Sequence, residues 1–373
     1  LTSLDVSSNT SLTTLACAGN PLTTLDVSNN TALTNLSCSQ NQLTSLDVSA
    51  NTALTSLQCG YNQITSLDIS SNTVLTSLYC SENQLTSLDV SSNTALTDLG
   101  CAVNQITSLD VSSNTALILL WCQDNQLTSL DVSSNTSLDN LQCHDNQLTT
   151  LDVSNNTALT YLNCYGNQLT SLDVSGAIAL ESLYCHENQL TNLDVSVNTA
   201  LRNFEFTANQ LTAVDLSNNT ALAWLKCSSN QLTSLDVSLN PNLFFLSCSG
   251  NELTSLDVSA NTALTYLRCE DNQLTYLNIR NQNPNAITDF YAFENSLTCI
   301  ETLDPDYATA NWTLANENID AGVTFDVICG AEAQTNWYVA TTGSDASGSG
   351  TLASPLSSIQ TAIYAASSGD TVS

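Results

Sequence analysis

Basic residues are nearly missing from this 373-residue chain. It has 4 lysines and arginines against 35 aspartates and glutamates, which gives a formal net charge of -31 at pH 7. A surface this negative repels phosphate backbones and anionic membrane faces, so nucleic acid is excluded as a partner. Cations and proteins with basic patches are favoured instead. A simpler interpretation is that the charge keeps a long repetitive protein in solution.

Long apolar runs are missing as well. Methionine is absent, and no stretch of about 18 apolar residues occurs, so the sequence predicts no direct membrane insertion. It also contains no recognisable secretory leader. The chain starts within a repeat at Leu1 and stops abruptly at Ser373. We therefore expect it to be a piece of a longer protein, whose targeting signals lie outside this sequence.

A repeat of 21 residues fills most of the chain. Each unit has two halves of the form L-x-x-L-x-Φ-x-x-N, such as Leu75–Asn83 and Leu85–Asn93, where Φ is Cys or Val. Apolar and polar residues alternate within L-x-Φ, which predicts a short strand, and neither half has room for a helix. Cysteine marks the repeat, and Phe206 fills its one gap: Cys17, Cys38, Cys59, Cys80, Cys101, Cys122, Cys143, Cys164, Cys185, Cys227, Cys248 and Cys269.

The repeat resembles one known family. The stretch LTSLYCSENQLTSLDVSSN at residues 75–93 is similar to bacterial leucine-rich repeats with 21-residue units of the form LxxLxLxxNxLxxLDLxxNxx. The resemblance covers roughly residues 1–300. It implies an all-β leucine-rich-repeat solenoid with two short parallel strands per coil. Members of the family commonly present a long surface to varied partners, so it implies binding rather than catalysis.

The conserved columns of the repeat have structural interpretations. Stacked cysteines have parallel Cβ vectors, which is poor disulfide geometry, and one continuous column lacks the paired spacing of a zinc site. We therefore predict that the repeat cysteines are free and buried. Two asparagine columns, one through Asn62 and one through Asn51, are predicted to hydrogen-bond the backbone of their own coil and of its neighbour.

Cys299 and Cys329 depart from the 21-residue step. They flank a non-repeating segment that contains Trp312, after a last coil whose register continues at Ile287 beyond a two-residue insertion near Pro284. A solenoid must cover its last coil, and surface proteins of the Bacteroidota type in the resembling family often end in such a cap. We predict that these two cysteines form a disulfide that closes the cap. This disulfide implies an oxidising, extracellular or cell-surface location.

Three domains are therefore expected: the solenoid at 1–298, the cap at 299–333 and a further piece at 334–373. The last piece contains Trp337–Asp345, Gly350–Pro355, Ile359–Ile363 and Ser368–Val372. It resembles the opening strand, loop and capping helix of a pectate-lyase-like right-handed parallel β-helix. The coils that carry substrate-binding and catalytic residues in that family lie outside this sequence. We therefore predict no catalytic residues in this chain.

The two sides of the coil differ in how much they vary. The valine side repeats Ser-Asp-Ser in most coils, whereas the cysteine side changes from coil to coil. Exposed aromatic and basic residues are typical of binding hot spots, although lone aromatics also simply favour strands. The predicted ligand-binding residues on the cysteine side are Tyr79, Trp121, Tyr161, Tyr184, Trp224, Lys226, Phe245, Tyr266 and Arg268. The basic residues cluster late in the solenoid, at Arg202, Lys226, Arg268 and Arg280.

Metal binding has one candidate on the constant side, where aspartate recurs in every coil from Asp5 to Asp257. Stacked carboxylates repel, and either serine hydroxyls or Ca²⁺ could offset this. One aspartate per coil is few ligands for Ca²⁺, so we expect no dedicated metal site. His144 and His186 lie two coils apart, at about 9–10 Å, too far to share an ion.

The sequence therefore predicts an adhesion-like binding solenoid that recognises a glycan or a protein through its cysteine side. Two alternatives stay open at this point. The solenoid could be a targeting appendage of a polysaccharide-degrading β-helix enzyme, or a structural spacer or filament component that associates with itself.

Overall fold

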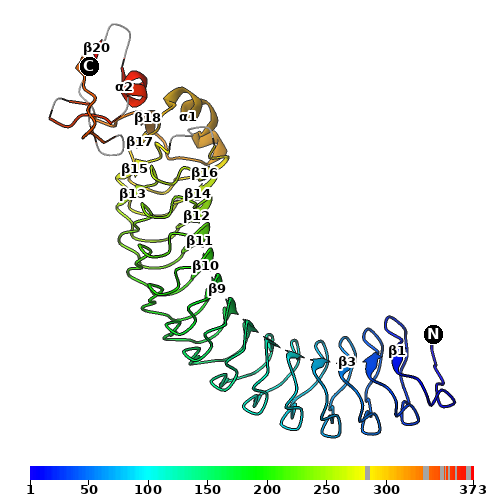
Figure 1. Cartoon of the computed structure of the whole chain (residues 1–373). Coiled ribbons are helices and arrows are strands. Elements are labelled where there is room, and N and C mark those ends of the chain that lie inside the picture. The colour runs from blue at the N-terminus through cyan, green and yellow to red at the C-terminus, as the bar shows by residue number, and fades with distance from the viewer. Residues whose placement is uncertain are drawn as a thin grey trace. The chain divides into compact units, whose positions relative to one another are not determined.

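The computed structural model describes residues 1–281, 286–330, 336–344, 348, 350–351, 353–357, 359–366 and 371–373. The chain divides into two compact units, Leu1–Asn198 and Thr199–Ser373, which we call unit 1 and unit 2. Figure 1 shows the coils and strands of both. The predicted insertion near Pro284 lies outside the described residues.

Unit 1 is a stack of coils in which the cysteine side of each coil forms a three-residue strand. Each strand pairs in parallel with the next at a step of 21 residues, as in Leu57 with Leu78. The strands are β1 (Thr14–Ala16), β2 (Asn35–Ser37), β3 (Ser56–Gln58), β4 (Ser77–Tyr79), β5 (Asp98–Gly100), β6 (Leu119–Trp121), β7 (Asn140–Gln142), β8 (Tyr161–Asn163) and β9 (Ser182–Tyr184).

Unit 2 has coils of the same kind and carries strands on both sides. The cysteine side has β10 (Asn203–Glu205), β11 (Trp224–Lys226), β12 (Phe245–Ser247), β14 (Tyr266–Arg268) and β16 (Asp289–Tyr291), paired in that order. The valine side has β13 (Ser255–Asp257), β15 (Tyr276–Asn278), β17 (Cys299–Glu301) and β18 (Thr324–Asp326). Tyr266 pairs with Asp289, so the register resumes after the two extra residues.

The leucine-rich-repeat fold is confirmed, but the expectation of two strands in every coil is wrong in part. Within the described residues, named strands on the valine side occur only in unit 2, and in unit 1 a single bridge joins Asp152 to Asp173. A ladder needs its strands about 4.8 Å apart. On the valine side of unit 1 the backbone hydrogen bonds between coils are isolated, as from the N–H of Gln42 to the carbonyl of Leu22 (2.8 Å), and do not make a ladder.

The core consists of the predicted columns. The repeat cysteines are free and buried, as expected, and burial raises the pKa of the Cys59 thiol to about 12. Phe206 fills the gap in the column and packs against Phe204, with ring centroids 4.7 Å apart. These thiols are therefore small apolar core groups that stay protonated.

Both asparagine columns hold neighbouring coils together, as predicted. The Nδ2 of Asn51 donates to the carbonyls of Val27 (3.0 Å) and Asn30 (2.9 Å) in the preceding coil. In the other column, Asn62 donates to the carbonyl of Cys38 and accepts from the N–H of Leu43 at 3.0 Å. Asn62 thus satisfies an N–H that the backbone leaves unpaired, whereas Asn51 adds a second donor to carbonyls that already accept the N–H groups of Asn30 and Leu33.

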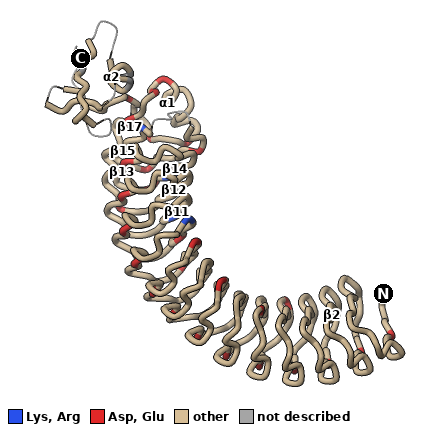
Figure 2. Tube along the Cα trace, viewed as in Figure 1, with Lys and Arg blue, Asp and Glu red and all other residues tan. Residues whose placement is uncertain are grey.

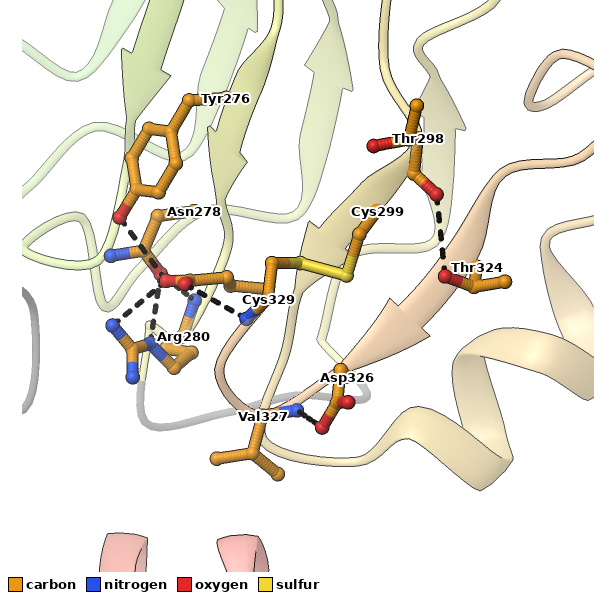
Figure 3. The surroundings of a disulfide bond; sticks show 10 residues. Tyr276, Asn278, Arg280, Thr298, Cys299, Thr324, Asp326, Val327 and Cys329 are labelled. Atoms are coloured by element: carbon orange, nitrogen blue, oxygen red, sulfur yellow. Dashed lines mark hydrogen bonds and ion pairs between the residues drawn. A yellow bond between two sulfur atoms is a disulfide. The ribbon is translucent and has the colours of Figure 1, made fainter. Parts of the chain in front are cut away.

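The predicted disulfide is confirmed and lies beside a compact cap (Figure 3). Cys299 begins β17, and Cys329 follows β18 with a Cα–Cα distance of 5.8 Å. Between these strands lie α1 (Pro305–Asn311), which is capped by Asp304, and the 3-10 helix η1 (Leu314–Asn316). Trp312 packs against Phe290 of the last coil, with ring centroids 4.5 Å apart and the rings tilted by 34°, so the cap covers the open end of the core.

The remaining residues form β19 (Asn336–Trp337), α2 (Ile359–Ala365) and β20 (Thr371–Val372). The two strands pair in parallel, and Leu356 and Ala362 are buried with Val327 and Ile328. The β-helix resemblance of this piece stays a prediction, as do the domain boundaries. Among the described residues, no helix has the length and apolar character needed to span a membrane, and α1 and α2 have seven residues each.

Candidate recognition face on the cysteine side

The strands determine which side chains the cysteine side displays. In each strand the middle residue points into the core, and in most strands the first and third residues are at least partly exposed. Because the strands pair in register, equivalent residues of successive coils form columns about 4.8 Å apart. All nine of the predicted ligand-binding residues lie in these columns and are partly exposed.

In unit 2 three aromatic residues of successive coils stack. Trp224 and Phe245 have ring centroids 5.4 Å apart, and Phe245 and Tyr266 are 3.9 Å apart with an interplanar angle of 13°. Their strands β11, β12 and β14 hold them in register. We call these three residues, together with Lys226 and Arg268, the Trp224 cluster.

The two cations of the Trp224 cluster lie over its rings. The Nζ of Lys226 is 4.8 Å from the centroid of Trp224, and the guanidinium of Arg268 is 5.1 Å from that of Tyr266. Acidic residues also hold both cations: Lys226 pairs with Glu205 at 3.7 Å, and Arg268 pairs with Asp289 at 3.2 Å. The cluster is therefore a pre-ordered aromatic surface with nearly balanced charge.

Asp289 and Tyr291 also belong to this surface, although they were not among the residues predicted from the sequence. Tyr291 lies 4.7 Å below the guanidinium of Arg268. Both could have been predicted, because Phe290 continues the core leucine column. Its two neighbours in the strand therefore fall in the exposed columns. The grouping of Arg280 with the exposed basic residues was wrong. Its side chain is only 2% exposed and pairs with Glu301 at 2.8 Å, because it continues a valine-side strand into the cap (Figure 3).

In unit 1 the predicted aromatics form two separate pairs. Tyr79 and Trp121 have ring centroids 5.9 Å apart although they lie two coils apart. Gly100 lies between them, and a Cβ there would come within 2.7 Å of the Tyr79 ring. The glycine thus lets the two rings approach. The other pair is Tyr161 and Tyr184, at 5.6 Å.

A groove lies beside the Tyr79–Trp121 pair. It has a volume of about 540 Å³, and small residues of the column after cysteine, such as Gly60 and Ala102, line it together with the two rings and the exposed Tyr61. A groove of this size with aromatic walls and few charges has the character of a pocket for an inserted side chain.

Three rings also stack along the column that follows the cysteines. His144 and His186 lie on either side of Tyr165, with centroid distances of 4.4 and 4.3 Å. Burial lowers the pKa of His144 to about 4, against the opposing effect of the Asp145 charge. The pKa of nearby Asp124 is raised by burial and by the charges of Asp145 and Glu82. This part of unit 1 therefore concentrates negative charge beside a neutral imidazole.

The constant valine side has a repeated local structure. The Oδ1 of each aspartate accepts the N–H of the serine two residues later, as in Asp89 and Ser91 at 2.9 Å. Hydrogen bonds from this serine lower the pKa of Asp89. The predicted serine hydroxyl donors are present, as in Ser28 to Asp26 at 2.7 Å. Figure 2 shows the recurring acidic residues. The expectation that this column holds no dedicated calcium site stays a prediction.

No protein-family model and no curated protein matches the sequence, but many solved structures match the fold. The functional domain of InlJ from Listeria monocytogenes, described as including a cysteine ladder, is 39% identical over 79% of this chain and 70% of its own, with a TM-score of 0.68. An internalin, inlF, from the same species is 25% identical over 76% and 86%, with a TM-score of 0.69. The Leptospira interrogans protein LIC12759 is 24% identical over 84% and 85%, with a TM-score of 0.72, and shows likeness of fold alone.

Proposed function

Because this chain belongs to the bacterial leucine-rich-repeat proteins, we propose that it is an extracellular recognition solenoid that binds a protein partner through its cysteine-side face. Its similarity to internalins supports a binding role rather than an enzymatic one. The Cys299–Cys329 disulfide supports an oxidising location outside the cell.

The Trp224 cluster is the single observation that carries this proposal. Stacked rings are already ordered, so a partner that covers them loses little further side-chain entropy on this side. Tryptophan, tyrosine and arginine are the residues most enriched at binding hot spots. The cluster combines them on adjacent strands, whereas the valine side of the same coils repeats one short motif.

Carbohydrate is the competing ligand class, because sugar rings also stack on exposed aromatics. A protein is favoured because Lys226 and Arg268 are each paired with an acid next to the rings. A partner can exchange these ion pairs for its own, which gives selectivity by charge complementarity. The alternative of a self-associating spacer requires no such aromatic cluster.

The test is a binding screen of the whole chain against arrays of cell-surface proteins and of glycans. A variant that combines Trp224→Ala, Phe245→Ala and Arg268→Ala removes the centre of the cluster. Loss of one hot-spot residue costs about 2 kcal/mol, so we expect the variant to bind the protein hit more than about 30-fold more weakly.

The matched control changes the opposite side of neighbouring coils, with Thr212→Ala, Thr233→Ala and Thr254→Ala, which are all exposed. It should bind like the parent. Equal loss in both variants, or binding to glycans only, would refute a protein-binding site on this face. Absence of any hit, together with concentration-dependent assembly in sedimentation, would favour the spacer.

A further inference from the structure

Side chains from two successive coils of unit 1 meet on the cysteine side. Asp124 and Asp145 hold the same position in these coils, two residues after the cysteine, and His144 precedes Asp145. One nitrogen or oxygen atom of each side chain lies within 4.8 Å of the other two. Within the described part of the chain, this is the only trio of histidine, cysteine or acidic residues found so close together.

The backbone holds the two carboxylates on one line. Asp124 and Asp145 have left-handed backbone conformations, with φ of 53° and 50°. The N–H of Asp124 donates to the carbonyl of His144 at 3.1 Å, and that of Asp145 donates to the carbonyl of Tyr165 at 3.0 Å. The turns are therefore tied to each other in register, and the two negative charges cannot separate by more than side-chain rotation.

Gly166 makes room for one of these carboxylates. It occupies the next position in the same column, with φ of +60°, and a Cβ there would lie 2.6 Å from the Oδ1 of Asp145. Two coils beyond Asp145 the same column carries Glu187. The absence of a side chain at Gly166 thus creates a small recess into which the Asp145 carboxylate fits.

The imidazole of His144 is held rigidly beside the acids. Its ring stacks on Tyr165, and its Nδ1 is buried from solvent and makes no hydrogen bond. This atom lies 3.4 Å from the Oδ2 of Asp145. A buried ring nitrogen without a hydrogen bond is costly, and so are two adjacent carboxylates without a counter-ion. One cation would offset both costs.

We propose that Asp124, His144 and Asp145 bind one divalent transition-metal ion of the zinc class. Imidazole and carboxylate together suit such an ion, whereas Ca²⁺ requires six to eight oxygen ligands. Tetrahedral ligands at about 2.1 Å from the metal lie about 3.4 Å apart, so the exposed aspartates need only small rotations. Three protein ligands leave a coordination position open to water or to a side chain of a partner.

The site is independent of the Trp224 cluster and of the proposed protein partner. Elsewhere in the column after cysteine many residues are small, for example Ser39, Gly60 and Ala102. These residues offer no imidazole. The site therefore belongs to this coil pair rather than to the repeat in general, and it differs from the aspartate column of the valine side.

The test is titration of the whole chain with Zn²⁺ alone by isothermal titration calorimetry. We expect one ion per chain, and His144→Gln and Asp145→Asn should each weaken binding by more than about tenfold. The matched control is His186→Gln combined with Glu187→Gln, which alters the equivalent histidine and acid two coils further on. It should retain the affinity of the parent within about threefold.

Titration with Co²⁺ separates this site from the cysteines, because thiolate ligands add an intense sulfur-to-metal absorption band that nitrogen and oxygen ligands lack. Circular dichroism checks that each variant is folded. If one of the variants does not fold, Asp124→Asn takes its place, because the Asp124 side chain is exposed and its substitution should not disturb the core. A thiolate band, equal loss in the control, or no Zn²⁺ uptake by the folded parent would overturn the proposal.

Discussion

The ion pair between Arg280 and Glu301 is buried beside the cap and should make the cap sensitive to a single substitution. The Nη2 of Arg280 lies 2.8 Å from the Oε2 of Glu301, and the side chains are only 2% and 7% exposed. Glu301 also accepts from the hydroxyl of Tyr276 and from the N–H of Cys329, each at 3.1 Å. Removing one charge leaves the other buried and uncompensated, which costs about 3–5 kcal/mol.

We therefore predict that Arg280→Met and Glu301→Gln each destabilise the cap strongly. Glutamine is chosen because its carbonyl oxygen can still accept from the N–H of Cys329. The expected loss corresponds to about 150- to 4,500-fold faster amide hydrogen exchange in β17 and β18. The double variant should lose less cap stability than the sum of the losses in the two single variants, because neither buried charge remains.

The measurement is hydrogen exchange by mass spectrometry, which resolves the cap from the rest of a long repeat protein. Burial raises the pKa of Glu301, although Arg280 opposes this shift. An acid whose pKa is higher in the folded state stabilises that state as the pH falls toward this value. The loss of cap stability caused by Arg280→Met should therefore become smaller at lower pH, where Glu301 is protonated and no buried charge is left unpaired. Additive effects of the two substitutions, with no pH dependence, would refute this reasoning.

Three further predictions concern the rest of the fold. Replacing Cys299 and Cys329 by alanine opens a loop closed across 30 residues and should cost about 3.6 kcal/mol in the cap, and unchanged hydrogen exchange there would contradict this. Asn156→Ala removes two buried hydrogen bonds, to the carbonyls of Val132 and Asn135, and should cost about 1–3 kcal/mol, although each carbonyl keeps one backbone donor. The exposed neighbour is the control, and Asn155→Ala should be nearly neutral in thermal melts. Asp89 has a lowered pKa, so it stabilises the fold above the ordinary value of 3.8 and loses this effect as the pH falls through its folded-state pKa. The difference in melting temperature between the parent and Asp89→Asn should therefore disappear in acid, and a constant difference would argue against the serine hydrogen bonds as its cause.

The interactions predicted from the sequence are those that the period alone determines. A step of 21 residues places each cysteine above the previous one, so burial of the column and its lack of disulfides follow from repetition. The same argument predicts the asparagine hydrogen bonds, such as Asn51 to Val27, because every coil repeats the same turn beside the same asparagine. The exposed columns that hold Trp224 and Tyr266 follow from strand alternation.

Tertiary structure decided the contacts between side chains of different columns. A repeat specifies the column of a residue, but not the direction in which a long side chain leans. The lean of Tyr79 toward Trp121 depends on the missing Cβ of Gly100, and the approach of His144 to Asp124 depends on the stack with Tyr165.

At the end of the solenoid, too, some features follow from the sequence and others only from the tertiary structure. The sequence by itself determined that Cys299 and Cys329 leave the repeat and that the coils form a leucine-rich-repeat stack. It did not determine that Arg280 would be buried against Glu301, or that unit 1 would keep its regular strands on one side only. The repeat period determines spacing along the solenoid axis, whereas the burial of a cap residue such as Arg280 depends on which side chains pack around it in three dimensions.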